Sequence, residues 1–255
     1  MSTSAGGVQS VNRALDLLEL LARGPMAVGD LATAASLAVP TAHRLARTLV
    51  ERGYVQQLAD RRYALGYGLV PLGRAADDLA GVDVETVLAG LVEATGESAN
   101  VAILVGDQAQ YLAQSQSRHA MRMFTEVGRR VDLHCTGVGK AMLAQLDDAA
   151  VEAIVGRRGL LRHTETTIST PAALRTELAA VRSRGYALDE QEQEVGVRCV
   201  AVPVDAGAGS WLAVSVSGPA PRMTDAVIAR AVPLLRDAGA RLVAGRRERL
   251  GQSSR

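Results

Sequence analysis

The spacing of the apolar residues changes at Gly53, and this change restricts the fold more than any other feature of the chain. Before it, three segments (from Ser10 to Gly24, 28–36 and 40–52) place apolar residues three or four positions apart, as amphipathic helices do. After it, residues 54–58 and 62–65 have the composition of two short strands around a tight turn. Three helices followed by a hairpin are typical of a winged helix-turn-helix domain, which we place at residues 8–66.

Positive charge gathers on the third of these helices and on the hairpin turn. Between Pro40 and Arg62, five arginines stand against Glu51 and Asp60, which leaves a local charge of +3 in a chain whose net charge is +1. Short polar and basic side chains near the start of such a helix can reach base edges and phosphates. A small helical domain with a solvated basic face is the alternative. We expect contacts to double-stranded DNA from Thr41, His43, Arg44, Arg47, Arg61 and Arg62.

The rest of the chain predicts a connecting helix and then a second, α/β domain. Residues 67–82 read as the linker helix, in which Pro71 is tolerated only in the first turn or at a kink. From residue 83 to residue 250, helical and strand-like segments alternate, so the whole chain is of the α+β class. The helices expected there are 83–95, 138–146, 148–155, 171–184 and 223–245, and the strands are 101–105, 111–113, 121–127, 199–204 and 211–217.

Length and composition exclude several classes of protein. With 255 residues, 48% of them hydrophobic, the chain can form two ordinary domains with cores of their own. It has neither a charged start followed by an apolar stretch nor an apolar run long enough to span a bilayer. We therefore expect no signal peptide and no contact with a membrane. A cytoplasmic protein with reduced cysteines fits these features.

The segment LHCTGVGKAML, residues 133–143, allows three chemical interpretations: a phosphate-binding loop, a nucleophile with its base, or a helix start that binds another anion. A P-loop fails because Ala141 stands where a serine or threonine would bind magnesium, and His134 stands where the first glycine belongs. The dinucleotide-binding pattern fails as well, since Met142 replaces its third glycine. We therefore expect no nucleotide cofactor.

Neither cysteine predicts catalysis or metal binding. Cys135 directly follows His134, and neighbours in an extended segment point to opposite faces, so His134 is badly placed to act as its base. Cys199 stands in a strand-like run, where a buried thiol is the ordinary state. The four histidines and two cysteines show no metal-ligand spacing. We expect no catalytic residue, no metal ion and no cofactor.

The third interpretation of residues 133–143 remains. A glycine turn that enters a helix at about Val138 exposes backbone N–H groups at the positive end of the helix dipole. Gly137 lets a ligand approach the bare backbone closely. Such a site suits a carboxylate, although a glycine turn that serves packing alone has the same sequence. Lys140, the only lysine of the chain, is either a counter-ion for a ligand or a structural partner of other side chains.

Nearly the whole chain resembles the IclR family of bacterial transcription regulators. In the first domain the resemblance rests on residues 13–18, 40–45 and 53–54. In the second domain it rests on four motifs: LHCTGVGKA at 133–141, YALDE at 186–190, EVGVRCVAVP at 194–203 and SVSGP at 215–219. Pro40 departs from the family, in which a serine often stands there, and it removes one hydroxyl and one N–H that could bind phosphate.

The resemblance implies a winged helix-turn-helix domain, a linker helix and a GAF-like effector-binding domain. It also implies homodimers, often paired into tetramers, on palindromic operators. The implied effector is a small metabolite, frequently a carboxylate, held between the sheet and the glycine turn. The pocket residues carried over by motif are Gly137, Val138, Asp189, Val197, Cys199, Ser215 and Ser217, with Ala120 and Met123 as an apolar wall. The two serines alternate in a strand and so face one side, as do Val197 and Cys199.

The sequence thus favours a metabolite-responsive transcription regulator, with repression as the first expectation. An activator or a dual regulator is the alternative within the same class, because the sign of regulation depends on where the operator lies. An enzyme fused to a DNA-binding module is a distant alternative, since no nucleophile, base and orienting group occur together. A protein-interaction scaffold with an inactive pocket is another.

Overall fold

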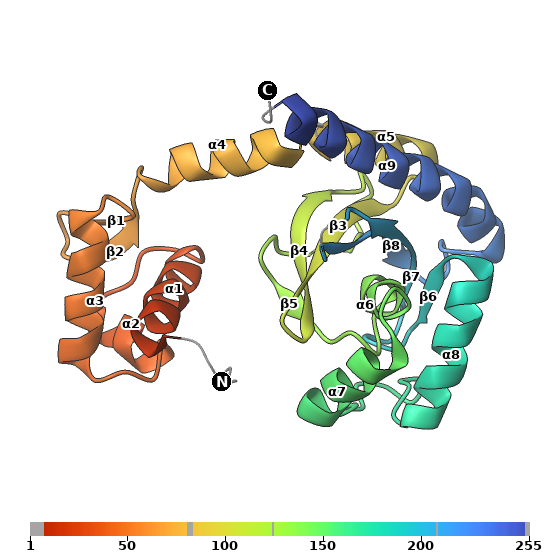
Figure 1. Cartoon of the computed structure of the whole chain (residues 1–255), viewed down its shortest axis with the longest axis horizontal. Coiled ribbons are helices and arrows are strands. Elements are labelled where there is room, and N and C mark those ends of the chain that lie inside the picture. Colours follow the sequence, from red (N-terminus) through yellow and green to blue (C-terminus); the bar gives the residue numbers. More distant parts are fainter. Residues whose placement is uncertain (1–7, 81–83, 124, 208, 253–255) are drawn as a thin grey trace. The chain divides into compact units, whose positions relative to one another are not determined.

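The computed structural model describes residues 8–80, 84–123, 125–207 and 209–252. The chain divides into two compact units, one that ends at Asp78 and one that begins at Leu79. Figure 1 shows the elements of each unit. Among the described residues, no helix has the length and apolar character needed to cross a membrane.

The first unit consists of three helices and a β-hairpin (Figure 1). The apolar faces of the helices meet in one core around Leu17, Leu31 and Leu49, and Val55 and Tyr63 bring the hairpin into that core. This arrangement confirms the predicted winged helix-turn-helix fold. The elements are α1 (Gln9–Leu21), α2 (Val28–Ala34), α3 (Val39–Glu51), β1 (Val55–Gln57) and β2 (Tyr63–Leu65), followed by α4 (Leu69–Ala80).

The second unit is built on a six-stranded antiparallel sheet with helices on both faces (Figure 1). The strand order is β5-β4-β3-β8-β7-β6. The strands are β3 (Ser98–Val105), β4 (Gln108–Ser115), β5 (Arg130–Val131), β6 (Ala187–Glu190), β7 (Val197–Asp205) and β8 (Trp211–Pro219). The helices are α5 (Val84–Thr95), α6 (Gly137–Leu143), α7 (Asp148–Arg158), α8 (Pro171–Arg184) and α9 (Asp225–Gln252).

The two faces of this sheet differ in the size of their side chains. On the face that packs against α5 and α9, the central strands present branched residues such as Val101 and Val200. On the face that packs against α6, the alternate positions are Ala102, Ala201 and Ala213. Because alanine side chains are short, they leave space for α6 to lie close to the sheet. This close approach places the start of α6 over the central strands.

The expected strand at 121–127 is wrong. The described residues of this segment form bends and turns, and the edge of the sheet is instead the short strand β5. Two side chains hold the segment: Ser98 Oγ donates to the carbonyl of Met123 at 3.2 Å, and Arg222 Nη2 donates to the carbonyl of Met121 at 2.8 Å. Side-chain donors therefore satisfy carbonyl groups that a strand would pair with another strand.

Two smaller differences concern the elements around the glycine turn. Strand β6 forms by pairing with β7, although only its motif and not its strand character was predicted. Helix α6 ends at Leu143, before the expected residue 146, so it has only seven residues. A helix this short has a weak dipole, and its N–H groups matter more than its macrodipole.

Candidate DNA-binding face and ligand pocket

Helix α3 turns its basic side chains to solvent because its small apolar residues are buried. Ala46 lies in the core, whereas His43, Arg44 and Arg47 are exposed. This division follows the helical period. An exposed row of one histidine and two arginines can reach base edges and phosphates in a DNA groove. Thr41, the first expected contact, is half buried near the start of the helix.

The hairpin turn adds two exposed arginines, Arg61 and Arg62, and Arg61 has the left-handed φ of 67°. Two of the expected DNA contacts form surface ion pairs: Arg47 Nε lies 3.1 Å from Glu51, and Arg62 Nε lies 2.7 Å from Asp60. The hydrogen bonds from the backbone and side chain of Arg62 lower the pKa of Asp60. Such exposed pairs contribute about 0–1 kcal/mol, so DNA phosphates can replace the carboxylates.

Four polar side chains form a row across the α6 face of the sheet. The strand register places Asp189 opposite Cys199, Cys199 opposite Ser217, and Ser217 opposite Ser98. Residues that pair directly across strands project to the same face. All four residues are buried. We call Asp189, Cys199, Ser217 and Ser98 the polar row.

Ser215 and Asn100 lie next to the polar row, where they pair across β8 and β3. Asn100 Nδ2 donates to Ser217 Oγ at 3.3 Å. The Ser215 hydroxyl is buried and meets no hydrogen-bond partner among the described residues. The Cys199 thiol is near enough for this hydroxyl to lower the thiol pKa, but the two do not meet hydrogen-bond geometry. Because a buried hydroxyl without a partner is costly, Ser215 is a candidate ligand contact.

The first turn of α6 covers the polar row. A methyl group on Gly137 would stand 2.9 Å from Cys199 Sγ, so only glycine lets the helix begin this close to β7. Thr136 caps the helix by accepting a hydrogen bond from the N–H of Gly139 at 3.1 Å. The N–H groups of Gly137 and Val138 have no acceptor within the helix or among the other described residues. The Val138 side chain is in the core, so only its backbone can contact a ligand.

Lys140 has a structural role. Its side chain is 1% exposed, and its ammonium pairs with Glu192 in the turn after β6. Lys140 Nζ also lies 3.6 Å from Glu177 Oε1 on α8, and Glu177 in turn accepts from Arg184 at 2.7 Å. Of the two roles open to this lysine, the structure shows the one in which it binds other side chains.

Asp189 combines burial with a hydrogen bond from the backbone. Its Oδ1 accepts from the N–H of Glu192 at 2.7 Å. Burial raises the pKa of Asp189 to about 7; the Glu192 charge adds to this rise, while that N–H and Lys140 oppose it. Near neutral pH this carboxyl can therefore donate or accept a hydrogen bond. Burial also raises the pKa of Cys199 to about 12, which keeps its thiol protonated.

Sequence reasoning missed Tyr111 and Asn100. The ring of Tyr111, on β4, packs against the core on the α6 side. Burial raises the pKa of its hydroxyl, and Cys199 and Asp189 add to the rise because they lie nearby. The polar row thus has an aromatic hydroxyl beside it. Alternate residues of a strand face the same side, which is why the two serines of β8 were grouped together. The same alternation places Ser98 and Asn100 of β3 on one face, and it is the sequence signal that could have revealed Asn100.

The other expected pocket residues lie at the margin of the polar row. Val197 is half buried and projects to the same face as Cys199, two positions away. Met123 is half buried, and its carbonyl accepts from the hydroxyl of Ser98 at the end of the row. Ala120 is exposed, and no hydrogen bond found among the described residues ties it to the row. Its assignment as a wall residue therefore stays a prediction.

The geometry expected around Cys135 is wrong. His134 and Cys135 lie in a turn before α6, and their side chains do not point to opposite faces as they would in an extended segment. The sulfur of Cys135, a ring nitrogen of His134 and a ring nitrogen of His163 lie within 4.8 Å of one another. His163 comes from the segment between α7 and α8. Spacing along the chain could not reveal this group, because the fold alone brings its members together.

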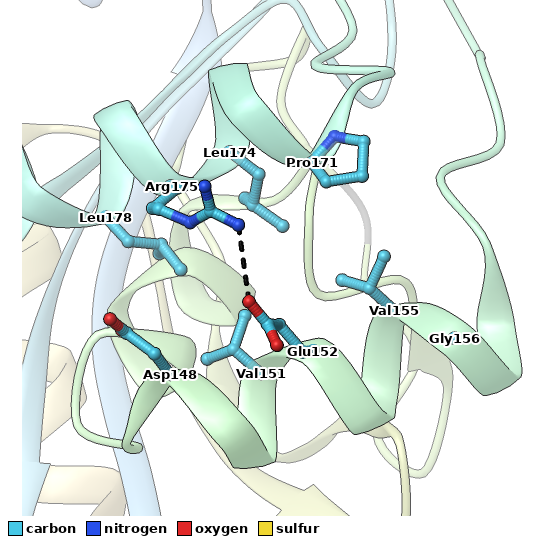
Figure 2. A pocket seen from close by; sticks show the side chains of 9 residues that line it. All are labelled: Asp148, Val151, Glu152, Val155, Gly156, Pro171, Leu174, Arg175 and Leu178. Carbon is cyan, nitrogen blue, oxygen red and sulfur yellow. Dashed lines mark hydrogen bonds and ion pairs between the residues drawn. The ribbon is translucent and has the colours of Figure 1, made fainter.

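A groove between α7 and α8 is a different kind of surface. Figure 2 shows Leu174 facing Val151 across it, and Arg175 Nη2 pairs with Glu152 Oε1 at 3.3 Å. The groove has a volume of about 240 Å³ and shares no residue with the polar row. Its floor is apolar and its ion pair is exposed, so it offers a small polar ligand fewer buried partners than the polar row does.

Comparison with known proteins assigns both units. Residues 10–59 match the IclR helix-turn-helix domain, and residues 82–244 match the bacterial transcriptional regulator IclR C-terminal domain. The chain is 36% identical over 233 residues to the transcriptional repressor IclR of Escherichia coli, with 87% of this chain and 84% of that protein covered. It is 33% identical over 231 residues to the HTH-type transcriptional repressor AllR of Salmonella paratyphi A, with 88% and 84% covered.

The fold agrees with these matches. An IclR transcriptional regulator from Alicyclobacillus acidocaldarius superimposes with a TM-score of 0.83 and 27% identity, over 94% of this chain and 99% of that one. The family models match the helix-turn-helix unit and the sheet unit separately, in the order in which the chain holds them. The chain therefore belongs to the IclR family of bacterial transcriptional regulators.

Proposed function

We propose that this regulator is a repressor that binds a palindromic operator as a homodimer and leaves it when a small polar effector binds over the polar row. The proposed effector carries a carboxylate or an amide. The observation that carries the proposal is the buried Ser215 hydroxyl, which has no partner among the described residues and lies on the sheet face that α6 covers. A ligand that supplies the missing partner gains a hydrogen bond that the protein alone lacks.

The groups around the polar row can recognise such a molecule without a free cation. The N–H groups of Gly137 and Val138 can donate to a carboxylate or carbonyl oxygen, and the hydroxyls of Ser215 and Ser217 can donate or accept. Asp189 can accept from an amide or hydroxyl, and its negative charge disfavours an anion bound in the wrong orientation. The buried ammonium is already paired with two glutamates and is not needed for the ligand.

Repression is the sign of regulation that the relatives support. Two proteins with 36% and 33% identity are named as repressors. A reporter gene placed behind the operator tests this: its transcription should fall when the protein is present and recover when the effector is added. A rise in transcription with the protein would favour activation, the alternative within the same class.

Operator binding should depend on the exposed face of α3. Arg44 is exposed and enters none of the ion pairs found among the described residues, so it is available to DNA. We expect Arg44→Ala to weaken operator binding by about 1–3 kcal/mol if the side chain contacts a base edge. Arg175→Ala, which removes an exposed arginine from α8, is the control and should bind as the parent does. If Arg44→Ala and Arg47→Ala both bind like the parent, α3 is not the reading element.

The effector can be found by a thermal-shift screen of small carboxylates and amides. A ligand at about 100 times its Kd stabilises the folded state by about 2.7 kcal/mol. We expect Ser217→Ala to weaken that ligand by about 0.5–1.5 kcal/mol, the net value of one neutral hydrogen bond. Ser183→Ala, on the exposed surface of α8, is the matched control and should have no effect.

Asp189→Ala separates ligand binding from DNA binding. The change should alter the affinity for the effector or the preference among effectors, and it should leave operator binding by the free protein intact. An effector found bound away from the polar row, with Ser217→Ala and Asp189→Ala fully responsive, would show that the pocket is elsewhere.

A further inference from the structure

Three side chains with metal-binding atoms meet at the turn before α6. His134 and Cys135 belong to this turn, and His163 belongs to the segment between α7 and α8. The cysteine sulfur and one nitrogen of each imidazole lie within 4.8 Å of one another. Around a tetrahedral zinc ion, nitrogen and sulfur ligand atoms are about 3.3–3.6 Å apart. The observed spacing exceeds that of bound ligands by no more than about 1.5 Å, so binding an ion would draw the three atoms together.

The hydrogen bonds of the two imidazoles leave one nitrogen of each ring available. His134 Nε2 is 2.9 Å from the carbonyl oxygen of Leu161, and His163 Nε2 is 3.2 Å from Asp132 Oδ2. Because a carbonyl and a carboxylate accept hydrogen bonds, each ring in this orientation carries its hydrogen on Nε2 and presents the lone pair of Nδ1. Histidines that bind metal ions commonly donate their other N–H to a carboxylate or a backbone carbonyl in this way.

The turn that carries two of the three side chains is held in place by Asp132. Its Oδ1 accepts from Arg158 at 2.9 Å, and its carbonyl accepts from the Thr136 hydroxyl at 2.8 Å. Ligands that are already held in position lose less freedom when an ion binds. The His163 side chain is 24% exposed, so the group borders the solvent on the side of this histidine.

We propose that His134, Cys135 and His163 bind one zinc-like divalent metal ion, with water as the fourth ligand. The Cys135 sulfur now donates to Gln193 Oε1 at 3.0 Å; when the ion binds, the thiol proton passes to solvent and a sulfur–metal bond replaces this contact. Two imidazoles and a thiolate select zinc or cobalt over magnesium and calcium, which prefer oxygen ligands.

This site would steady the helix that covers the polar row. Cys135 directly precedes Thr136, the cap of α6, and the N–H groups of Gly137 and Val138 follow. An ion held by Cys135 would therefore restrict the movement of these N–H groups. The metal site itself does not depend on the identity of the effector, so it can be tested without one.

Cobalt(II) binding to the full-length, reduced and metal-free protein tests the site, because a cysteine ligand gives a sulfur-to-cobalt charge-transfer absorption. We expect one cobalt ion per chain, with this absorption, and displacement by zinc. Cys135→Ser should abolish the charge-transfer absorption. His163→Gln and Asp132→Ala should each lower the cobalt affinity by about 10–100-fold, the first by removing a ligand and the second by releasing His163.

Two variants serve as controls. Cys199→Ser removes the other thiol, and His119→Gln removes an exposed histidine outside the group; both should keep the absorption and the affinity. If Cys135→Ser does not fold, His163→Gln still tests the site, because His163 is partly exposed. The proposal is overturned if no cobalt binds, if His163→Gln binds like the parent, or if the absorption depends on Cys199 instead of Cys135.

Discussion

At the scale of single residues, Lys140 shows how one buried charge can join three elements. It lies on α6 and pairs with Glu192 after β6 and with Glu177 on α8. One carboxylate oxygen of Glu192 has no hydrogen-bond partner among the described residues. The ammonium is therefore the main compensation for the buried charge of Glu192, since an unpaired charge inside a protein is costly.

Removing this ammonium should destabilise the protein more than removing a surface pair. We expect Lys140→Met to lower the free energy of unfolding by about 3–5 kcal/mol, because it leaves a buried carboxylate unpaired. Urea denaturation followed by circular dichroism measures this. Arg175→Ala breaks the exposed pair with Glu152 and should cost less than about 1 kcal/mol. Adding Glu192→Leu to Lys140→Met should recover much of the lost free energy of unfolding, because the unpaired carboxylate is then removed. If the double variant is no more stable than Lys140→Met, the broken pair with Glu192 does not cause the loss.

Asp189 predicts a dependence of stability on pH. Burial raises the pKa of the Asp189 carboxyl in the folded protein to about 7, above the pKa of the same carboxyl in the unfolded chain. The stability linked to this carboxyl is therefore fully present below the unfolded-state pKa and is lost as the pH rises to about 7. Denaturation at a series of pH values measures this dependence. Between about pH 4 and pH 7, the free energy of unfolding of Asp189→Asn should rise relative to that of the parent by up to about 1.4 kcal/mol for each pH unit. Asp60→Asn, at an exposed carboxyl with a lowered pKa, should show no such gain. A pH-independent difference for Asp189→Asn would contradict this account.

At the scale of the element, α6 is a short helix whose position depends on its glycines. A methyl group on Gly139 would stand 2.4 Å from the Cα and carbonyl oxygen of Leu133. These are backbone atoms, so they cannot rotate away as a flexible side chain could. Gly137 meets the side chain of Cys199 instead, at 2.9 Å. The first turn thus lies closer to its surroundings than a residue with a Cβ atom would allow.

Two glycine-to-alanine changes should have opposite effects on stability. We expect Gly139→Ala to lower the free energy of unfolding by at least about 1–3 kcal/mol, because the helix must move to relieve the contact with Leu133. Gly156→Ala, inside α7 where nothing lies within 4 Å, should raise it by about 0.5–1 kcal/mol through better helix propensity. Denaturation midpoints of the two variants measure both effects, and equal stability of the two would refute the close approach at Gly139.

At the scale of the whole molecule, charge is distributed unevenly along the chain. The net charge is +1, yet residues 40–62 carry +3, and the exposed arginines of α3 and the hairpin lie within them. Within the helix-turn-helix unit, electrostatic attraction to DNA phosphates is therefore expected from this segment, which holds the exposed arginines of α3 and the hairpin turn. An arginine in this segment can neutralise a phosphate or read a base, and the two roles differ in their salt and sequence dependence.

The salt dependence of operator binding should reveal the phosphate contacts. We expect Arg61→Ala with Arg62→Ala to reduce the slope of log K against log salt concentration by up to about 2, with little change in sequence preference. Arg44→Ala should instead relax the preference at one base position. Fluorescence anisotropy at several salt concentrations, with operator and unrelated duplexes, measures both. An unchanged slope in the double variant would show that the hairpin turn does not touch DNA.

The sequence alone determined the features that arise from neighbouring residues. Apolar spacing predicted the three helices and the hairpin of the first unit, and α8 begins and ends where its pattern and Gly185 indicated. The motifs also named Asp189, Cys199 and Ser217, which the strand register then aligned on one face. These predictions held because helix periodicity, strand alternation and turn chemistry depend on residues close together in the chain.

Only the tertiary structure decided the features that depend on distant residues. The segment 121–127 has the composition of a strand, but hydrogen bonds from Ser98 and Arg222 hold it as a bent segment. The partners of Lys140 come from other elements, and His163 reaches Cys135 only because the chain folds back between α7 and α8. Such contacts follow from packing across the domain, where hydrogen bonding and the burial of charge override local propensity.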